Sequence, residues 1–359
     1  MRQLVSAVGE VSIRRRYWQC RCGTTDGAYA ADEMLGLDGR YSRIVQKHAC
    51  RLAADQSFAL AQEHLREMLA VRVSAETLRT LSERHGKAMQ HFQRADDETA
   101  QAFRNAAGEV EFTVDAGKVN TREEGWKDLK IGVIQKRKSG EPASPAGWNK
   151  QRLPAATIVL AFAMIATAKE FRRSWRGRLR QLGVRSCASV QVLADGASWI
   201  WKAVQRVLTG CVQTLDFYHA CAHLSKAAKG VFGEGTAAAQ TAYQRGRSLL
   251  LEKGWQGVCE WVSELLTIQD EVERERRRPH TDRALQYFVK HTNRLNYAER
   301  LHSGRAIGSG AVEGKAKTLG LRLKARGARW RKANVPAIAS LVCVRHSTNW
   351  ASYWKSLSV

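Results

Sequence analysis

The sequence predicts a mixed α/β protein that carries an all-helical insertion and is preceded by a helical region. Residues 109–120 and 126–137 are β-rich runs separated by a short turn, as in a hairpin. Three further apolar runs then alternate with helical patterns, an order typical of a mixed sheet. Residues 224–301 show helical spacing and many charges but no strand pattern. These observations together predict the fold class.

The region before the sheet divides into two parts. Residues 1–40 contain a basic, β-branched stretch and glycine-bearing turns, whereas residues 41–108 have helical patterns. Ser74 has the side chain of an N-cap, and Glu76 lies in the first turn that would follow it. The helical pattern breaks at 71–73 and resumes after Ser74, and two helices joined by such a short turn can form a DNA-reading helix-turn-helix. A plain packed helical hairpin is the alternative, and spacing alone favours it.

The insertion divides the predicted sheet region into two parts. The first part, residues 109–223, precedes the helical residues 224–301, and the second part, residues 302–359, follows them. The apolar strand runs after the first hairpin are 157–165, 189–198 and 211–220, with helical patterns at 168–183 and 199–208 between them. We expect the last part to pack back onto the sheet as helices.

The charge of the chain restricts its partners. Its 359 residues include 58 Lys and Arg against 34 Asp and Glu, a formal net charge of +24. Such an excess attracts polyanions, most commonly nucleic acid, although a ribosomal or membrane-surface association would also fit charge alone. The longest uncharged run, 153–168, is shorter than the ~20 apolar residues of a membrane-spanning helix. The N-terminus lacks the apolar core of a signal peptide, and the eight cysteines show no disulfide framework, so we expect a cytoplasmic protein.

Three acidic residues stand where an α/β sheet places catalytic groups. Asp115 and Asp195 end strand runs, and Glu313 begins a helix after a glycine-rich turn. Ligands of such sheets gather at the carboxyl ends of strands. Three carboxylates brought together repel one another unless cations share the charge, and oxygen-only clusters suit Mg²⁺ or Mn²⁺. For each acid taken singly, a turn-forming or capping role is the alternative.

Several segments resemble a known family in content and order: TVDAGKV, LADGASWIW, LDFYHACAHL, IGSGAVEGKAK and RLKARGARW. From about Arg14 to the C-terminus, the chain resembles transposases of the Kra-type insertion sequences, prokaryotic relatives of the Mutator-like DDE transposases. The resemblance implies an RNase H-like core in which Asp115, Asp195 and Glu313 are catalytic and hold two Mg²⁺ or Mn²⁺ ions. It implies metal-dependent DNA cleavage at transposon ends and transfer of the cut strand to a target. Because two DNA ends must be held together, we expect a homo-oligomer on DNA.

Two other functions remain open at this point. An RNase H-like nuclease or junction resolvase would cleave DNA without joining strands. A truncated, catalytically inactive relic of a mobile element would bind DNA and do neither.

The resemblance is weakest at the N-terminus. Relatives often have a cysteine pair upstream of the YWQCRCG segment, as a small zinc-binding module would, but here only Cys20 and Cys22 remain. We therefore expect no zinc site, and residues 1–40 are at most a remnant of such a module in a shortened reading frame. The first acidic motif also has alanine after Asp115 where glycine is expected, which leaves the carboxylate unchanged.

Further residues are assigned from the resemblance and from charge. The family's Cys-or-Asp, two residues, then His motif matches Asp216 and His219, which would support the site or form a plain structural pair. Trp199 and Trp201 could stack on an unpaired base, with helix core as the alternative for at least one of them. A basic stretch after Glu313 could follow a DNA backbone, with a solvated helix face as the alternative. Its residues are Lys315, Lys317, Arg322, Lys324, Arg326, Arg329 and Arg331.

Overall fold

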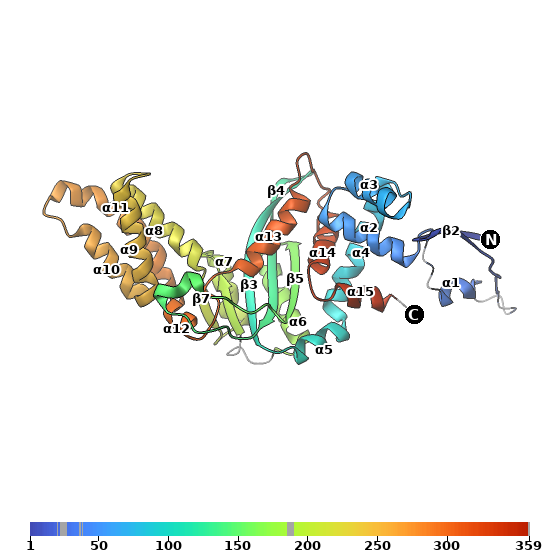
Figure 1. Ribbon diagram of the computed structural model, residues 1–359, viewed down its shortest axis with the longest axis horizontal. Coiled ribbons are helices and arrows are strands. Elements are labelled where there is room, and N and C mark those ends of the chain that lie inside the picture. Colours follow the sequence, from blue (N-terminus) through green and yellow to red (C-terminus); the bar gives the residue numbers. More distant parts are fainter. Residues whose placement is uncertain (20, 22–26, 36, 38, 185–189, 358–359) are drawn as a thin grey trace.

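The computed structural model describes every residue except 20, 22–26, 36, 38, 185–189 and 358–359. The molecule is elongated, with a sheet at its centre, a helical arm at one end and an N-terminal hairpin at the other (Figure 1). The prediction about Cys20 and Cys22 therefore lies outside the described residues.

The N-terminal region is a hairpin followed by helices. The strands and helices are β1 (Arg2–Ser6), β2 (Gly9–Ile13), α1 (Ala30–Met34), α2 (Arg43–Asp55), α3 (Phe58–Leu69), α4 (Ala75–Ala95) and α5 (Asp97–Asn105). Ser74 caps α4, because its hydroxyl accepts a hydrogen bond from the Thr77 N–H at 3.1 Å, as predicted. α4 packs against α2 and against α14 (Val335–Arg345), and a Cβ at Gly86 would lie 2.1 Å from the Ala337 carbonyl oxygen. Such close packing on α4 favours a packed hairpin over a DNA-reading helix.

The central sheet has five strands in the order β5-β4-β3-β6-β7. They are β3 (Glu109–Thr121), β4 (Gly125–Arg137), β5 (Ile158–Ile165), β6 (Val190–Ala194) and β7 (Val212–Leu215). β3, β4 and β5 form an antiparallel meander, in which β3 and β4 pair over 13 residues each, and β6 and β7 run parallel to β3. The mixed α/β class is confirmed.

The two faces of the sheet pack against different helices. The helices on the first face are α6 (Ala168–Gln181) and α7 (Ser198–Val207), and those on the second are α13 (Gly310–Leu323) and α14. Along β3, Phe112 and Val114 belong to the core beneath α6 and α7, whereas Val119 belongs to the core beneath α13. Alternate strand side chains point to opposite faces, so position along β3 decides which helices a side chain meets.

The helical arm enters after β7. Its helices are α8 (Phe217–Phe232), α9 (Ala237–Lys253), α10 (Trp255–Leu266), α11 (Glu271–Phe288), the 3₁₀ turn η3 (Val289–Arg294) and α12 (Tyr297–His302). α8 begins at Phe217, so the predicted strand run at 211–220 is too long: β7 ends at Leu215, and the chain turns into a helix where Asp216 supplies the cap. The remaining pieces are the 3₁₀ turn η1 (Pro145–Lys150) and α15 (Trp350–Ser356).

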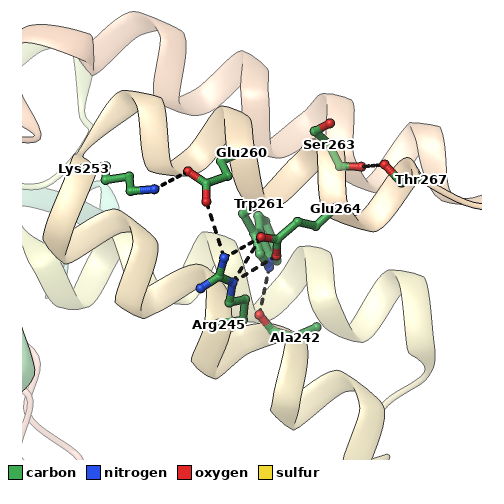
Figure 2. A network of polar contacts seen from close by, with 8 residues as sticks. All are labelled: Ala242, Arg245, Lys253, Glu260, Trp261, Ser263, Glu264 and Thr267. Atoms are coloured by element: carbon green, nitrogen blue, oxygen red, sulfur yellow. Dashed lines mark hydrogen bonds and ion pairs between the residues drawn. The ribbon is translucent and has the colours of Figure 1, made fainter.

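Ion pairs tie α9 to α10 within the arm (Figure 2). The Arg245 guanidinium of α9 reaches Glu260 at 3.4 Å and Glu264 at 2.6 Å, both on α10. Beneath them, the Trp261 indole N–H donates to the Ala242 carbonyl at 2.8 Å. The arm is thus a packed unit with its own buried aromatic residue.

None of the helices in the described part of the chain combines the length and apolar character needed to cross a bilayer.

Candidate functional site

Asp115, Asp195 and Asp216 lie at matching positions on three neighbouring parallel strands. The β3–β6 pairing ends at Val114 and Ala194, and Asp115 and Asp195 are the next residues on each strand. The β6–β7 pairing ends at Ala194 and Leu215, and the Asp216 N–H donates to the Ala194 carbonyl at 2.8 Å. Three aspartates therefore follow one another across the carboxyl ends of β6 and β7 and the middle of β3. The prediction that Asp115 ends a strand is wrong, because β3 continues to Thr121 through its long pairing with β4.

Strand alternation turns Asp115 toward α13. Val114 lies in the core beneath α6 and α7, so the following side chain points to the opposite face, where Val119 also lies. α13 covers that face and contacts β3 and β4, crossing in front of the strands in Figure 1.

Glu313 lies in the first turn of α13, the helix that covers the face of the sheet to which Asp115 points. The Ser309 hydroxyl donates to Glu313 Oε1 at 2.8 Å, and the Glu313 N–H donates to the Ser309 carbonyl at 3.2 Å. A carboxylate in the first turn of a helix is favoured by the helix dipole. The Glu313 side chain is exposed, so a ligand can reach it.

Several charged groups from different elements act on the Asp115 carboxyl. Burial raises the pKa of Asp115, the bond its carboxylate accepts from the Ala116 N–H at 2.7 Å lowers it, and the charges of Asp195 and Glu313 raise it further, while His219 opposes them. Groups from β3, the end of β6, α8 and α13 thus act on one carboxyl group. An accumulation of negative charge on this scale favours either a bound cation or a bound proton.

Asp216 links the start of α8 to the start of α13. Its side chain is fully buried; Oδ1 accepts from the His219 N–H at 2.7 Å and Oδ2 accepts from the Ser309 N–H at 2.6 Å. A Cβ at Gly308 would lie 2.9 Å from the Tyr218 ring and 3.5 Å from Asp216 Oδ2, so the turn before α13 packs directly on this link. Because Ser309 in turn holds Glu313, Asp216 acts as a positioning residue for the acid on α13.

One group of three side chains among the described residues has the geometry of a cation site. Ligand atoms of Asp216, His219 and Glu313 all lie within 4.8 Å of one another. Its donors are two carboxylates and an imidazole, a set that first-row transition ions accept more readily than Mg²⁺ does. Asp115 and Asp195, predicted as metal ligands with Glu313, lie outside this group of three, so the structure brings Glu313 closest to the supporting pair.

The two tryptophans after Asp195 pack into the protein. Trp201 is buried, its indole N–H donates to the Asp195 carbonyl at 2.8 Å, and the Arg294 guanidinium lies 4.4 Å from its ring centroid. It is therefore a core residue that fixes the Asp195 turn, and we do not retain it as a base-stacking residue. Trp199 is half-buried, with Lys130 Nζ 4.3 Å from its ring centroid.

Tyr287 of α11 reaches the site from the arm, and sequence reasoning missed it. Its ring stacks on His223 with a centroid distance of 3.4 Å, and a Cβ at Gly196 would lie 2.6 Å from it. Burial raises the pKa of the Tyr287 hydroxyl, and the charges of Asp195 and Asp216 add to the rise. The arm therefore closes one side of the acidic row. A tyrosine in a charged helix carries no local signal of such a long-range contact.

Two of the seven predicted DNA-binding cations are committed to the protein itself. Arg322 is buried; its Nε donates to the Ala53 carbonyl at 2.5 Å, and its guanidinium lies 4.5 Å from the Phe58 ring centroid. Lys315 is half-buried, and its ammonium donates to the His346 carbonyl. These contacts within the protein use the donors that a phosphate would need, so we do not propose Arg322 or Lys315 as primary phosphate contacts, although Arg322 borders the cleft described next.

The other five cations are exposed: Lys317, Lys324, Arg326, Arg329 and Arg331. A cleft of about 1310 Å³ between the β3–β4 turn, the start of α3 and α4, and the loop after α13 includes Arg122, Arg326, Arg329 and Arg331 in its lining. We call it the arginine cleft. The Arg122 N–H donates to the Trp330 carbonyl at 2.8 Å, which ties the loop to the sheet. An open cleft with several exposed guanidinium groups suits a phosphate backbone.

No protein-family model matches this sequence, and no curated protein matches it either.

Proposed function

We propose that this protein is a DDE-type transposase that cuts DNA at the ends of a mobile element and joins the cut strand to a target. The observation that supports this best is the placement of the acids: Asp115 and Asp195 directly follow the paired ends of β3 and β6, and Glu313 lies in the first turn of α13, which packs on the face to which Asp115 points. Acids from two strands and a helix, in a chain of net charge +24, match what phosphoryl transfer on a nucleic acid needs.

The sheet topology supports an RNase H-like core for the proposed enzyme. Three antiparallel strands are followed by two parallel ones in the order β5-β4-β3-β6-β7, with α6 and α7 as the connections. The acids stand at its centre, on β3 and just after β6, and the helical arm enters between β7 and α13, ahead of the last acid.

Asp216, His219 and Glu313 fit a divalent cation, because ligand atoms of all three lie within 4.8 Å of one another. Asp115 and Asp195, at neighbouring strand positions, would hold divalent cations together with Glu313. Bound there, Mg²⁺ or Mn²⁺ would activate the attacking water or DNA 3′-hydroxyl and stabilise the leaving oxygen.

The chain's own residues would position the DNA. Asp216 holds Glu313 in place through Ser309, and the arginine cleft next to α13 would bind the backbone leading to the cut. Exposed guanidinium groups pair with phosphate oxygens in two-pronged hydrogen bonds. Two copies of the chain on DNA would bring two ends together.

The test is strand transfer with duplexes that carry the sequences flanking this reading frame. With Mg²⁺ or Mn²⁺, we expect cleaved product and joined product from the unaltered chain. Asp115→Asn and Glu313→Gln should each abolish both products while DNA binding persists.

Glu275→Gln, an exposed arm residue paired with Arg278, is the matched control and should keep both products. Cleavage without joining would replace the proposal with a nuclease. Binding with neither product would replace it with an inactive relic, and activity that survives both catalytic substitutions would refute the assigned site.

A further inference from the structure

A basic stripe runs along the exposed side of α6. Arg172, Arg173, Arg176 and Arg180 fall within about 100° of arc on a helix of 3.6 residues per turn. The buried side carries Phe171, Trp175 and Leu179 instead. The single acid of α6, Glu170, is taken up by the capping box with Thr167, where its Oε2 accepts the Thr167 N–H at 2.8 Å.

The end of α7 extends this stripe into a hollowed surface. Arg176 donates to the Arg206 carbonyl at 3.2 Å, and a depression of about 280 Å³ is lined by Arg172, Arg173, Arg176 and Arg206 alone. A neighbouring depression of about 610 Å³ includes Arg180 in its lining. We call Arg172, Arg173, Arg176, Arg180 and Arg206 the α6 patch.

The guanidinium groups of the α6 patch have little counter-charge, since the acid that acts on them, Glu170, is bonded to Thr167 and interacts with Arg173 through charge alone. Within the described residues, none of its five guanidinium groups forms an ion pair with a carboxylate. In α11, by contrast, Arg276, Arg277 and Arg278 all pair with glutamates one turn away. Like charges at i and i+4, such as Arg172 and Arg176, repel one another in the free protein. An anion that binds to the patch would reduce this repulsion.

The α6 patch lies on the opposite face of the sheet from α13. The helix that carries it starts at the end of β5 that lies level with Gly117 of β3. α6 and α7 pack on the face opposite α13. β5 ends at Ile165, which pairs with Leu129, and Leu129 pairs with Gly117, two residues beyond Asp115. α6 begins three residues after that strand end and leads away from the acidic row.

We propose that the α6 patch binds the phosphate backbone of a second DNA segment while the arginine cleft holds the first. That the anion is DNA rests on the proposed function, because an enzyme that joins strands must hold a donor and a recipient at once. Arg172 to Arg180 span about 12 Å of helix, the rise of roughly three to four base pairs, so the patch can contact several successive phosphates. Guanidinium groups suit this ligand because they bind phosphate through paired hydrogen bonds without reading sequence.

Binding to a random-sequence duplex, measured by fluorescence anisotropy in EDTA across a range of salt, tests the patch without any turnover. The full-length triple variant Arg173→Gln, Arg176→Gln, Arg206→Gln should lose about 2 to 3 from the slope of log affinity against log salt, since each phosphate contact contributes about 0.9. A control that also removes three positive charges is Lys229→Gln, Lys253→Gln, Arg278→Gln, whose residues are paired on the arm. The control should keep the slope of the unaltered chain.

Stoichiometry at saturation separates the two surfaces. Analytical ultracentrifugation should show two duplex segments per chain for the unaltered protein and one for the patch variant. It should also show one for a cleft variant, Arg326→Gln, Arg329→Gln, Arg331→Gln. Thermal unfolding checks that all variants remain folded, and the patch variant should be at least as stable as the unaltered chain because repulsion is removed.

Three outcomes would overturn the inference. The patch variant could keep both its slope and two segments per chain, or the arm control could lose as much slope as the patch variant. Alternatively, the patch substitutions could abolish binding to anionic phospholipid vesicles while DNA stoichiometry stays at two, which would assign the patch to a membrane surface. Because no cleavage is measured, a failure of the proposed catalysis would leave these readings unchanged.

Discussion

Replacing Asp216 with asparagine tests the link that positions Glu313. The change keeps the size of the side chain but replaces one acceptor oxygen with an N–H₂ group. In the structure both oxygens are used: Oδ1 accepts from His219 N–H at 2.7 Å and Oδ2 from Ser309 N–H at 2.6 Å. Whichever way the amide turns, one of the two backbone N–H groups faces a donor and loses its bond.

The expected loss follows from burial. Asp216 is fully buried, so water cannot replace the missing acceptor. A buried donor left without a partner costs about 1–3 kcal/mol, and we expect Asp216→Asn to lower the stability of this region by that amount. Asp216→Ala should cost more, about 2–4 kcal/mol, because the α8 N-cap is lost as well. The start of α13 should then loosen, and Glu313 with it.

Hydrogen–deuterium exchange resolves this locally. Peptides covering Ser309 should exchange faster in Asp216→Asn, whereas peptides from α9 and α10 should not change. Asp270→Asn is the matched control, since Asp270 caps α11 at an exposed position and accepts from the N–H groups of Val272 and Glu273. Asparagine caps as well as aspartate, so the control should behave as the unaltered chain. Unchanged Ser309 protection and unchanged stability in Asp216→Asn would refute the proposed link.

Four further predictions concern other sites. Burial and nearby acids raise the pKa of Asp115, so the folded chain binds the carboxyl proton more tightly than the unfolded chain does. The stability that this proton contributes is fully present below the ordinary carboxyl pKa and is lost as the pH rises through the raised pKa of the folded state. Asp115→Asn should therefore raise the Tm at neutral pH, with a gain that vanishes in acid; a gain independent of pH would contradict this. Mn²⁺ at 100 times its Kd should stabilise the chain by about 2.7 kcal/mol in thermal scans, and Glu313→Gln should remove most of that effect. Arg322→Ala should destabilise by about 1–3 kcal/mol in urea titrations because the Ala53 carbonyl loses its donor, yet leave the salt slope of DNA binding unchanged. Gly177→Ala on the exposed side of α6, where a Cβ would meet nothing within 4 Å, should stabilise by about 0.5–1 kcal/mol in the absence of DNA.

The strands of the first hairpin and the turn after Asp195 were predictable because their signals are local, whereas the mid-strand position of Asp115 was not, because β3 runs past it. Period-2 runs located β3 and β4, and small residues after Asp195 indicated the turn in which its Oδ1 accepts the Ala197 N–H at 2.9 Å. The limits of β7 were not predictable from apolarity. Leu215, Phe217 and Tyr218 flank Asp216 with apolar side chains, and only the cap geometry at Asp216 shows that a helix has begun.

The contacts of side chains that pack against residues far away in the sequence could not be predicted. Arg322 belongs to a basic stretch that looks uniform in sequence, but α13 turns it onto Phe58 and the end of α2. Trp201 is likewise indistinguishable from Trp199 until the helix places one indole against the Asp195 turn. Spacing along a helix gives the direction of a side chain relative to its neighbours, and tertiary packing decides what it meets.

The length of the β3–β4 pairing has a consequence for the proposed chemistry. A slip of β3 by one residue against its neighbours would send Asp115 to the α6 side and bring Val114 beneath α13. Thirteen consecutive residue pairs with β4 would have to shift together for that to happen. The hairpin therefore fixes the register of β3, which keeps the Asp115 side chain on the side of the sheet that carries α13 and Glu313.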